Sequence, residues 1–231
     1  MQLFYLPAAP KNTILSKEES FHCIQVLRYK KGDKIYCTDG KGKMYSGVIG
    51  NGDKNSCAIM NLKAEKKIKN HFNIHLVVAP TKSFDKMEWM VEKISEIGVD
   101  KITFIYTEHS ERRKINKDRL EKKSIAAMKQ SNALIKTEIN DIVSFDQFIN
   151  HLSDNGQKYI AHMNKKNKSI QTIYKKDKRY TILIGPEGDF TLKEIEMAYK
   201  NGFKGISLGE NTLRTETASL LACYSIIQSN M

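Results

Sequence analysis

The sequence has few prolines, few cysteines and no long apolar run. Its 231 residues include 4 prolines, 4 cysteines and 1 tryptophan. No apolar stretch approaches the roughly 20 residues that a membrane-spanning helix needs. The first residues, Met-Gln-Leu-Phe-Tyr-Leu-Pro, lack the basic and apolar regions of a signal peptide. We therefore expect a cytoplasmic protein that makes no use of a membrane.

The cysteines do not form a recognisable site. They stand far apart in the sequence, without the paired spacing of metal sites or of disulfide-rich domains: Cys23, Cys37, Cys57 and Cys223. We expect them to be reduced thiols, as is usual in a reducing compartment, and we expect no bound metal.

Positive charge is concentrated in the first part of the chain. Residues 1–70 hold 13 lysines and arginines against 6 aspartates and glutamates, whereas the remaining residues hold 25 against 20. Such an uneven basic segment is typical of a protein that contacts nucleic acid. A general excess of lysine, with the side chains merely solvated, is the alternative reading.

Two apolar runs near the C-terminal end each stop at glycine and polar residues and then lead into a helical pattern. The first is Tyr-Thr-Ile-Leu-Ile-Gly-Pro-Glu-Gly-Asp-Phe-Thr over 180–191, and the second is Ile-Ser-Leu-Gly-Glu-Asn-Thr-Leu-Arg-Thr-Glu-Thr-Ala over 206–218. A buried strand that ends in a glycine turn before a helix is how α/β folds build ligand sites. We expect the two turns to form two walls of one pocket.

The first turn is not typical of a phosphate site. Glu187 and Asp189 would repel a phosphate, although a helix N-terminus usually suits an anion. The stretch contains neither a Gly-x-Gly-x-x-Gly fingerprint nor a P-loop lysine. The turn therefore favours a neutral or cationic ligand. The alternative is that Gly185, Pro186 and Gly188 only make a turn and that Glu187 is solvated.

The motifs of these turns resemble those of a known enzyme class. Ile184-Gly-Pro-Glu-Gly188, Leu208-Gly209 and Leu213-Arg-Thr-Glu-Thr-Ala218 are similar to the SPOUT-class RNA methyltransferases, and most closely to the RsmE family. The resemblance implies transfer of a methyl group from S-adenosylmethionine to N3 of a uridine in 16S ribosomal RNA. It also implies a deep trefoil knot whose loops bind the methyl donor, and a homodimer whose active sites are completed across the interface.

The resemblance also implies roles for individual residues. Arg214 and Glu216 would be catalytic. The residues implied in cofactor binding are Met163, Ile184, Gly185, Pro186, Glu187, Gly188, Leu208, Gly209, Asn211, Leu213 and Thr217. The resemblance implies that Arg28 and Lys30 face RNA phosphate, with a surface salt bridge as the alternative for Arg28. Arg112 and Arg113 form a basic triplet with Lys114, which is a second candidate RNA contact or a solvated loop. An alternative role for Arg214 and Glu216 is a pair that fixes the loop.

The chemistry of the acceptor suggests what the two catalytic residues do. Uracil N3 carries a proton at neutral pH, and its loss spreads negative charge onto the neighbouring carbonyl oxygens. A fixed cation such as Arg214 can stabilise that charge. Arginine is a poor base because its pKa is very high. Either Glu216 or water would then accept the proton.

Residues 1–69 are typical of a small β-rich domain. Strands are expected over 3–6, 34–38, 44–49 and 56–62, with turns such as Asn51-Gly52 between them. A capping box at Ser16-Lys-Glu-Glu19 begins a helix through Leu27, whose expected core face is Phe21, Ile24, Val26 and Leu27. This spacing predicts a small barrel, and residues 26–33 resemble the PUA-like RNA-binding domain that opens RsmE-family chains.

Residues 70–231 predict a parallel α/β domain, which the resemblance identifies as the SPOUT methyltransferase domain. Strands are expected over 73–79, 101–106, 159–163 and 204–208, and an apolar helix over 218–227. Met87, Met90, Val91, Ile94 and Ile97 form a helical core stripe after a cap at Ser83. Further capping boxes begin at Ser144 and Thr191. His162 is read either as a core histidine at a strand end or as a neighbour of the cofactor.

One departure from the family pattern concerns residues 129–133. The family has a Glu-Gln pair followed by an arginine, whereas this chain has Lys129-Gln130 and Ala133.

The substrate is expected to be the assembled small ribosomal subunit, because a small barrel cannot select one uridine alone. Two other functions stay open. One is a non-catalytic RNA-binding or ribosome-assembly protein with the same fold, and the other is a nucleotide-dependent oxidoreductase.

Overall fold

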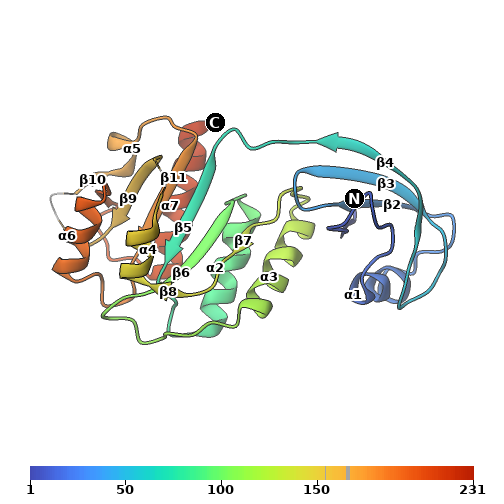
Figure 1. Ribbon diagram of the computed structural model, residues 1–231, viewed down its shortest axis with the longest axis horizontal. Coiled ribbons are helices and arrows are strands. Elements are labelled where there is room, and N and C mark those ends of the chain that lie inside the picture. Colours follow the sequence, from blue (N-terminus) through green and yellow to red (C-terminus); the bar gives the residue numbers. More distant parts are fainter. Residues whose placement is uncertain (154, 165–166) are drawn as a thin grey trace. The chain divides into compact units, whose positions relative to one another are not determined.

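The computed structural model describes residues 1–153, 155–164 and 167–231, which form two compact units (Figure 1). The first unit comprises residues 1–70 together with 125–136, and the second comprises 71–124 together with 137–231. The sequence predicted a single domain boundary after residue 69. It did not predict that residues 125–136 return to the first unit. Residues 134–136 belong to the first unit because their backbone bonds to residues 38–42. Leu134 O accepts hydrogen bonds from Thr38 Oγ1 (3.1 Å) and Gly42 N (2.9 Å).

The first unit contains a sheet in the order β1-β2-β3-β4, built from β1 (Leu3–Tyr5), β2 (Lys34–Thr38), β3 (Lys43–Ile49) and β4 (Ile59–Lys67). β1 pairs with β2 in parallel, and the other pairings are antiparallel. The last strand begins three residues later than predicted. The apolar core of this unit includes Phe4, Ile35, Cys37 and Ile49 of the sheet and Leu15 of the segment before α1.

The helical segment of the first unit differs from the prediction. The Ser16 hydroxyl accepts a hydrogen bond from Glu19 N, as expected of the cap, but α1 (Lys17–Phe21) continues as a π-helix, η1 (His22–Val26). The core face proposed for this helix was wrong in part, because Phe21 is 52% and Val26 is 56% exposed. A π-helix has more residues per turn than an α-helix, so the usual 3.6-residue spacing does not select its buried side.

The carboxylate of Glu19 is buried and holds the returning segment to the rest of the first unit. It accepts a hydrogen bond from Tyr5 N (3.3 Å) and forms an ion pair with the ammonium group of Lys129. Lys129 lies in the last turn of α3 (Lys117–Gln130). The residue that departs from the family pattern therefore has a structural partner within this unit.

The second unit is built on a parallel sheet. Its strands are β5 (Asn73–Val78), β6 (Lys101–Tyr106), β7 (Glu138–Ile139), β8 (Val143–Ser144), β9 (Gln157–Ala161), β10 (Lys168–Ser169), β11 (Arg179–Ile184) and β12 (Lys204–Ser207). The order is β10-β12-β9-β11-β5-β6-β7, and β8 pairs with β6. Every pairing among the described strands of this sheet is parallel. The predicted α/β class is confirmed, with β9 two residues earlier than expected.

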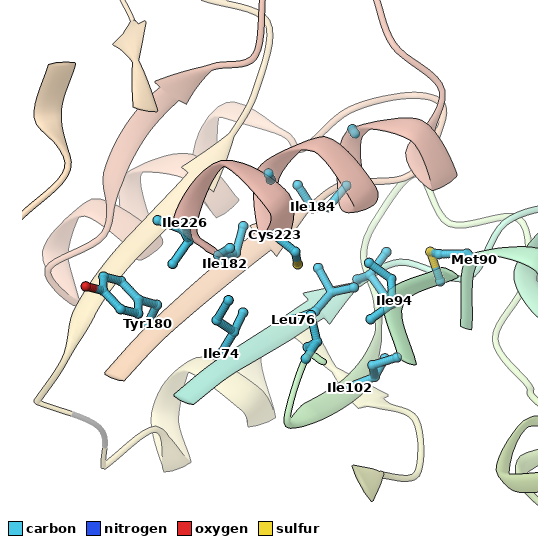
Figure 2. Packing of buried hydrophobic residues seen from close by; sticks show 14 of the residues in the cluster. Ile74, Leu76, Met90, Ile94, Ile102, Tyr180, Ile182, Ile184, Cys223 and Ile226 are labelled. Atoms are coloured by element: carbon cyan, nitrogen blue, oxygen red, sulfur yellow. The ribbon is translucent and has the colours of Figure 1, made fainter. Parts of the chain in front are cut away.

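Helices cover both faces of this sheet, and neighbouring residues along a strand point to opposite faces. They are α2 (Phe84–Glu96), α3, α4 (Phe145–His151), α5 (Ile170–Ile173), α6 (Leu192–Lys200) and α7 (Thr215–Asn230). Figure 2 shows Leu76, Ile182 and Ile184 of the strands packed with Met90 of α2 and Cys223 of α7. On the other face, Val77 and Leu183 pack in a second core with residues of α4 and α6.

The ends of the helices largely follow the predicted caps. Both capping boxes are confirmed, at Ser144 with Gln147 and at Thr191 with Glu194. Ser83 occupies the cap position of α2, but its side chain makes no capping hydrogen bond. α7 starts at Thr215, three residues earlier than predicted, and closes the core with Ala222, Cys223 and Ile226.

The remaining expectations concern cysteine and membranes. All four cysteines are free and buried. Burial raises the pKa of the Cys37 thiol to about 12, so this thiol is unreactive at neutral pH. Among the residues that the structure describes, no helix is long and apolar enough to cross a membrane.

Candidate active site at the carboxyl edge of the sheet

The glycine turns lie at the carboxyl edge of the parallel sheet. β9 pairs with both β11 and β12, so one strand separates the ends of the two strands that precede the turns. β5 flanks β11 on its other side, and all these strands run in the same direction. In open parallel sheets, this edge is where ligands bind.

A hydrogen bond joins the two turns directly. Thr215 Oγ1, at the end of the second turn, donates to Gly185 O in the first turn over 3.1 Å, and the bond is buried. Gly185 itself packs closely, since a Cβ on it would lie 3.1 Å from the ring of Phe190. The predicted meeting of the two turns is therefore confirmed.

The first turn is also held by the segment that follows β9. Asp189 has a backbone φ of 58°, in the left-handed region, and its Oδ2 accepts a hydrogen bond from Met163 N over 2.9 Å. Its Oδ1 accepts a hydrogen bond from the neighbouring Phe190 N (2.8 Å). The carboxylate of Asp189 thus links Met163 to the turn.

His109 supports the same turn from the end of β6. Its ring Nδ1 donates to Gly188 O (2.9 Å) and Asp189 O (3.0 Å), and these bonds to backbone carbonyls raise the pKa of the imidazole. A Cβ on Gly188 would lie 3.0 Å from the Cβ of His109. The glycine therefore allows the histidine to approach the turn.

The predicted catalytic residues line one cavity at this edge. It has a volume of about 370 Å³, and its lining residues are Lys82, Ser83, Lys86, Glu187, Arg214 and Glu216. This volume lies within the range of about 300–1,000 Å³ that is usual for small-molecule sites. Residues from three elements thus converge, namely the end of β5 with the start of α2, the first turn, and the start of α7.

Five of the six residues that line this cavity have charged side chains. Glu216 is only 8% exposed, and its carboxylate lies 3.7 Å from Lys86 Nζ. Lys82 N donates to Glu187 Oε1 over 3.3 Å, while the Lys82 ammonium pairs with Glu111 at 2.9 Å. The hydrogen bond to Glu111 raises the pKa of Lys82, so this lysine stays protonated.

Apart from Glu187, the residues predicted to bind the cofactor do not line this cavity. Ile184, Gly185 and Pro186 are buried at the end of β11, and Leu208 and Leu213 pack partly against the core. Gly188, Gly209, Asn211 and Met163 are exposed, and Thr217 is half-buried. Gly209 has a φ of 136°, which favours glycine, and a Cβ there would meet no atom within 4 Å. This turn is therefore open to a ligand.

Arg112 and Arg113, which were predicted to bind RNA, lie in the segment after β6. Arg112 Nη2 donates to Lys82 O over 2.8 Å, which braces the cavity wall. Its Nε is buried and has no hydrogen-bond partner among the described residues. Arg113 is exposed and lies over the ring of Tyr106, 5.3 Å from its centroid.

The other two residues predicted to bind RNA belong to the first unit. Arg28 and Lys30 are both exposed in the segment that follows η1. Arg28 has a φ of 57°, in the left-handed region that non-glycine residues rarely adopt. Lys30 N donates to Asp33 Oδ2 over 2.6 Å, which closes the turn and leaves the lysine side chain in solvent.

His162 follows β9 and bonds to a neighbouring helix. Its Nε2 lies 2.8 Å from the hydroxyl of Tyr199 in α6. Burial lowers the pKa of this imidazole, so it is neutral at physiological pH. These contacts support the reading of His162 as a packed residue at a strand end.

A larger hollow, of about 1,020 Å³, lies at the opposite edge of the sheet. It includes the first residues of β5, β6 and β11, and charges along it are paired, as in Lys101 with Glu138 (3.5 Å) and Lys117 with Asp141 (3.2 Å). The smaller cavity is the better candidate, because it combines the carboxyl edge with convergent charges from separate elements.

Three residues of the site were missed in the sequence: Lys82, Lys86 and His109. A signal for the two lysines exists, since β5 also ends in a turn, Pro80-Thr-Lys-Ser83, before a helix. The sequence argument used that turn only to begin the helix. No local pattern indicates that His109 reaches a turn 79 residues later.

Comparisons with known proteins show which proteins this chain is similar to. A family model described as an RNA methyltransferase domain matches residues 68–228, and an RNA methyltransferase PUA domain matches residues 15–59. The chain is 30% identical over 217 residues to ribosomal RNA small subunit methyltransferase E of Rickettsia conorii, covering 92% of this chain and 88% of that protein.

Several solved structures match along almost the whole chain, and two of them illustrate the similarity. The crystal structure of a probable rRNA-methyltransferase from Porphyromonas gingivalis has a TM-score of 0.92 at 39% identity, covering 99% of this chain and 98% of that one. Ribosomal RNA small subunit methyltransferase E from Neisseria gonorrhoeae, bound to S-adenosyl methionine, has a TM-score of 0.87 at 25% identity, with the same coverage.

Proposed function

The chain belongs to the ribosomal RNA small subunit methyltransferase E family, and from that membership we propose that it methylates N3 of a uridine in 16S ribosomal RNA. The methyl donor is S-adenosylmethionine. One observation carries the proposal beyond the family name. Arg214 and Glu216 line a cavity together with Glu187 of the first glycine turn, at the edge where parallel sheets bind ligands.

The two glycine turns and Met163 are the residues that would hold S-adenosylmethionine. They fit such a ligand because Gly209 is open, the turns are joined by Thr215 and Gly185, and Glu187 suits a cation better than a phosphate. When bound, S-adenosylmethionine supplies an activated methyl group on a positively charged sulfur. The contribution of the chain is to orient donor and acceptor in line.

Arg214 and Glu216 act on the acceptor. Uracil N3 loses its proton to Glu216 or to water, and then forms a bond to the methyl carbon. The electron pair of the broken carbon–sulfur bond stays on sulfur. Arg214 stabilises the negative charge that develops on the uracil oxygens, because a fixed cation needs no reorganisation during the reaction.

The finer features of the fold and assembly belong to the same proposal. We infer a deep trefoil knot in the second unit, supported by the insertion of β11 between β9 and β5, and a closed PUA-like barrel in the first.

We also infer a homodimer in the cytoplasm. Exposed Leu221 and Tyr224 on α7 provide apolar surface for such an interface. A monodisperse, active monomer would contradict the dimer.

The RNA substrate is proposed to be the assembled small subunit. Arg28, Lys30 and the other basic residues of the first unit supply contacts to phosphate, which position the RNA without reading its sequence. The target base must be unpaired or flipped out of a stack to enter the cavity. Equal methylation of free rRNA and of assembled subunits would contradict this part of the proposal.

Calorimetric titration and a methyl-transfer assay test the function. The protein is expected to bind S-adenosylmethionine but not NAD, and to transfer labelled methyl to unmodified small subunits at N3 of one uridine. The alternative is a non-catalytic RNA-binding protein with the same fold. It predicts RNA binding without S-adenosylmethionine binding, and this result would refute the enzyme assignment.

A further inference from the structure

Lys86 places a second cation in the cavity of Arg214. It lies in the first turn of α2, and its Nζ lies 3.7 Å from Glu216 Oε1. Arg214 precedes α7, so the two cations reach the same cavity from different elements. The sequence argument assigned no role to Lys86.

The lining brings cations and carboxylates together. Three lining residues are cationic, Lys82, Lys86 and Arg214, and two are carboxylates, Glu187 and Glu216. Lys82 also pairs with Glu111, at the edge of the cavity. Lys86 and Arg214 then face the buried Glu216 and the exposed Glu187, so two cations are matched by two carboxylates in the free protein. Once Glu216 has accepted the N3 proton, the two cations outnumber the remaining carboxylate, and this suits a base that has become negative.

The hydrogen-bonding groups of the lining also match one base. The reactive edge of uracil presents a carbonyl acceptor on either side of the N3–H donor. Ammonium and guanidinium groups only donate hydrogen bonds, and an ionised carboxylate only accepts them. Cytosine has an amino donor in place of one carbonyl and has no proton on N3. Its amino group would therefore point at a cation that can only donate, and no hydrogen bond could form there.

We propose that Lys86 contacts the acceptor base, selects uracil over cytosine, and shares with Arg214 the negative charge of the deprotonated uracil. This inference rests on the proposed methyl transfer and extends it. Lys86 stabilises one carbonyl oxygen, Arg214 stabilises the other, and Glu216 faces the N3 proton between them.

Lys86→Met tests the proposal against Lys86→Arg, which keeps the charge. Removing one donor to a developing oxyanion lowers kcat by about 100-fold in other enzymes. We expect a loss of that size in Lys86→Met, with the affinity for S-adenosylmethionine unchanged. The pH at which the rate rises should move upward, because the variant stabilises deprotonated uracil less well. Lys86→Arg should retain most of the rate and the wild-type pH profile.

Lys93→Met is the matched control. Lys93 lies on the same helix, and its ammonium pairs with Glu92 (3.0 Å) and Glu96 (2.9 Å) outside the cavity. Its substitution should leave kcat and the pH profile as in the wild type. Lys86→Gln, which is neutral and of similar length, gives the pH shift independently if Lys86→Met does not fold.

Binding provides a readout that does not depend on turnover. Small subunits are reconstituted with uridine or with cytidine at the position that the wild type methylates, and affinities are measured with S-adenosylhomocysteine present. The wild type should prefer uridine by about tenfold or more, and Lys86→Met should lose most of that preference. An unchanged preference and pH profile in Lys86→Met would overturn the role of Lys86. A wild-type protein that neither binds S-adenosylmethionine nor methylates RNA would instead refute the proposed function.

Discussion

The hydroxyl of Thr215 donates a hydrogen bond to the carbonyl oxygen of Gly185, 3.1 Å away, across 30 residues of sequence. This buried bond is a direct link between the second glycine turn and the first. It fixes the start of α7, and therefore Arg214 and Glu216, against the end of β11. The geometry of the site thus depends on a residue that does not itself line the cavity.

Replacing Thr215 by Val should weaken donor binding. Val keeps the branched shape of Thr but leaves Gly185 O without its buried partner, at a cost of about 1–3 kcal/mol. We expect the affinity for S-adenosylmethionine to fall by about tenfold in calorimetric titration. Thr172→Val is the control, since the exposed Thr172 hydroxyl in α5 donates to the O atom of Ser169, the N-cap of that helix. Equal affinities of the two variants would show that the link is not needed.

Replacing Arg214 by Ala should abolish methyl transfer while binding of S-adenosylmethionine persists. Arg214 is exposed in the free protein and lines the cavity beside Glu216, so it is available to an acceptor base. Loss of one charged donor predicts at least about a 100-fold fall in rate. Arg179→Ala, at the other end of β11, should remain active. Unchanged turnover in Arg214→Ala would refute the catalytic assignment.

Arg28→Gly should separate folding from RNA binding. The positive φ of Arg28 is unfavourable for a residue with a side chain, so glycine should raise the free energy of unfolding by up to about 1 kcal/mol. The same change would remove the proposed phosphate contact, and the slope of log affinity against log salt should then fall by about 1. Denaturant titration and RNA binding at several salt concentrations measure both effects. A variant that is more stable but binds RNA with the same slope would remove Arg28 from the interface.

Lys129→Met should destabilise the first unit. It leaves the buried carboxylate of Glu19 without its cation, and breaking a buried pair from one side costs about 3–5 kcal/mol. Lys129→Glu should destabilise this unit further, because it places a second negative charge next to Glu19. Lys123→Met breaks a more exposed pair with Glu92 and should cost about 1 kcal/mol or less. The double variant Glu19→Gln, Lys129→Met should recover part of the loss in denaturant titration.

His109 should make the stability of the first turn depend on pH. Its pKa in the folded protein is raised by the bonds to the Asp189 and Gly188 carbonyls. A raised pKa means that the contribution to stability is full below the unfolded value near 6.5 and is lost as the pH rises through the folded value. The melting temperature of the wild type relative to His109→Gln should therefore decline with rising pH over that window. A difference that is constant with pH would contradict this role.

The sequence predicted the helices and strands of this fold better than the tertiary contacts between them. Ile184 and Gly185 end a strand with a clear apolar run, and both capping boxes mark their helices, because these signals are local. The exposure of Phe21 and the approach of His109 to Gly188 depend on a π-helix and on distant packing, which no local period encodes. The placement of residues 125–136 in the first unit likewise depends on backbone bonds to residues 38–42.

For the site, the family motifs pointed to Arg214 and Glu216 as candidate catalytic residues, and both line the same cavity as Glu187. They did not indicate Lys86, which lies 130 residues before Glu216 and reaches it only when β5 and β11 pair. The loop residues expected to bind the donor follow from resemblance alone, since nothing in their spacing shows which atoms face a ligand.

The position of β11 between β5 and β9 has a consequence for synthesis. Both neighbours precede it in the chain, so until β11 is made the sheet is limited to β5 to β8 and β9 has no partner among the described strands. Until then the facing edges of β5 and β9 have open backbone groups that can pair with other chains. Truncated nascent chains should therefore be prone to aggregate and unable to retain a methyl donor, and the enzyme becomes competent only when nearly all of it has been translated.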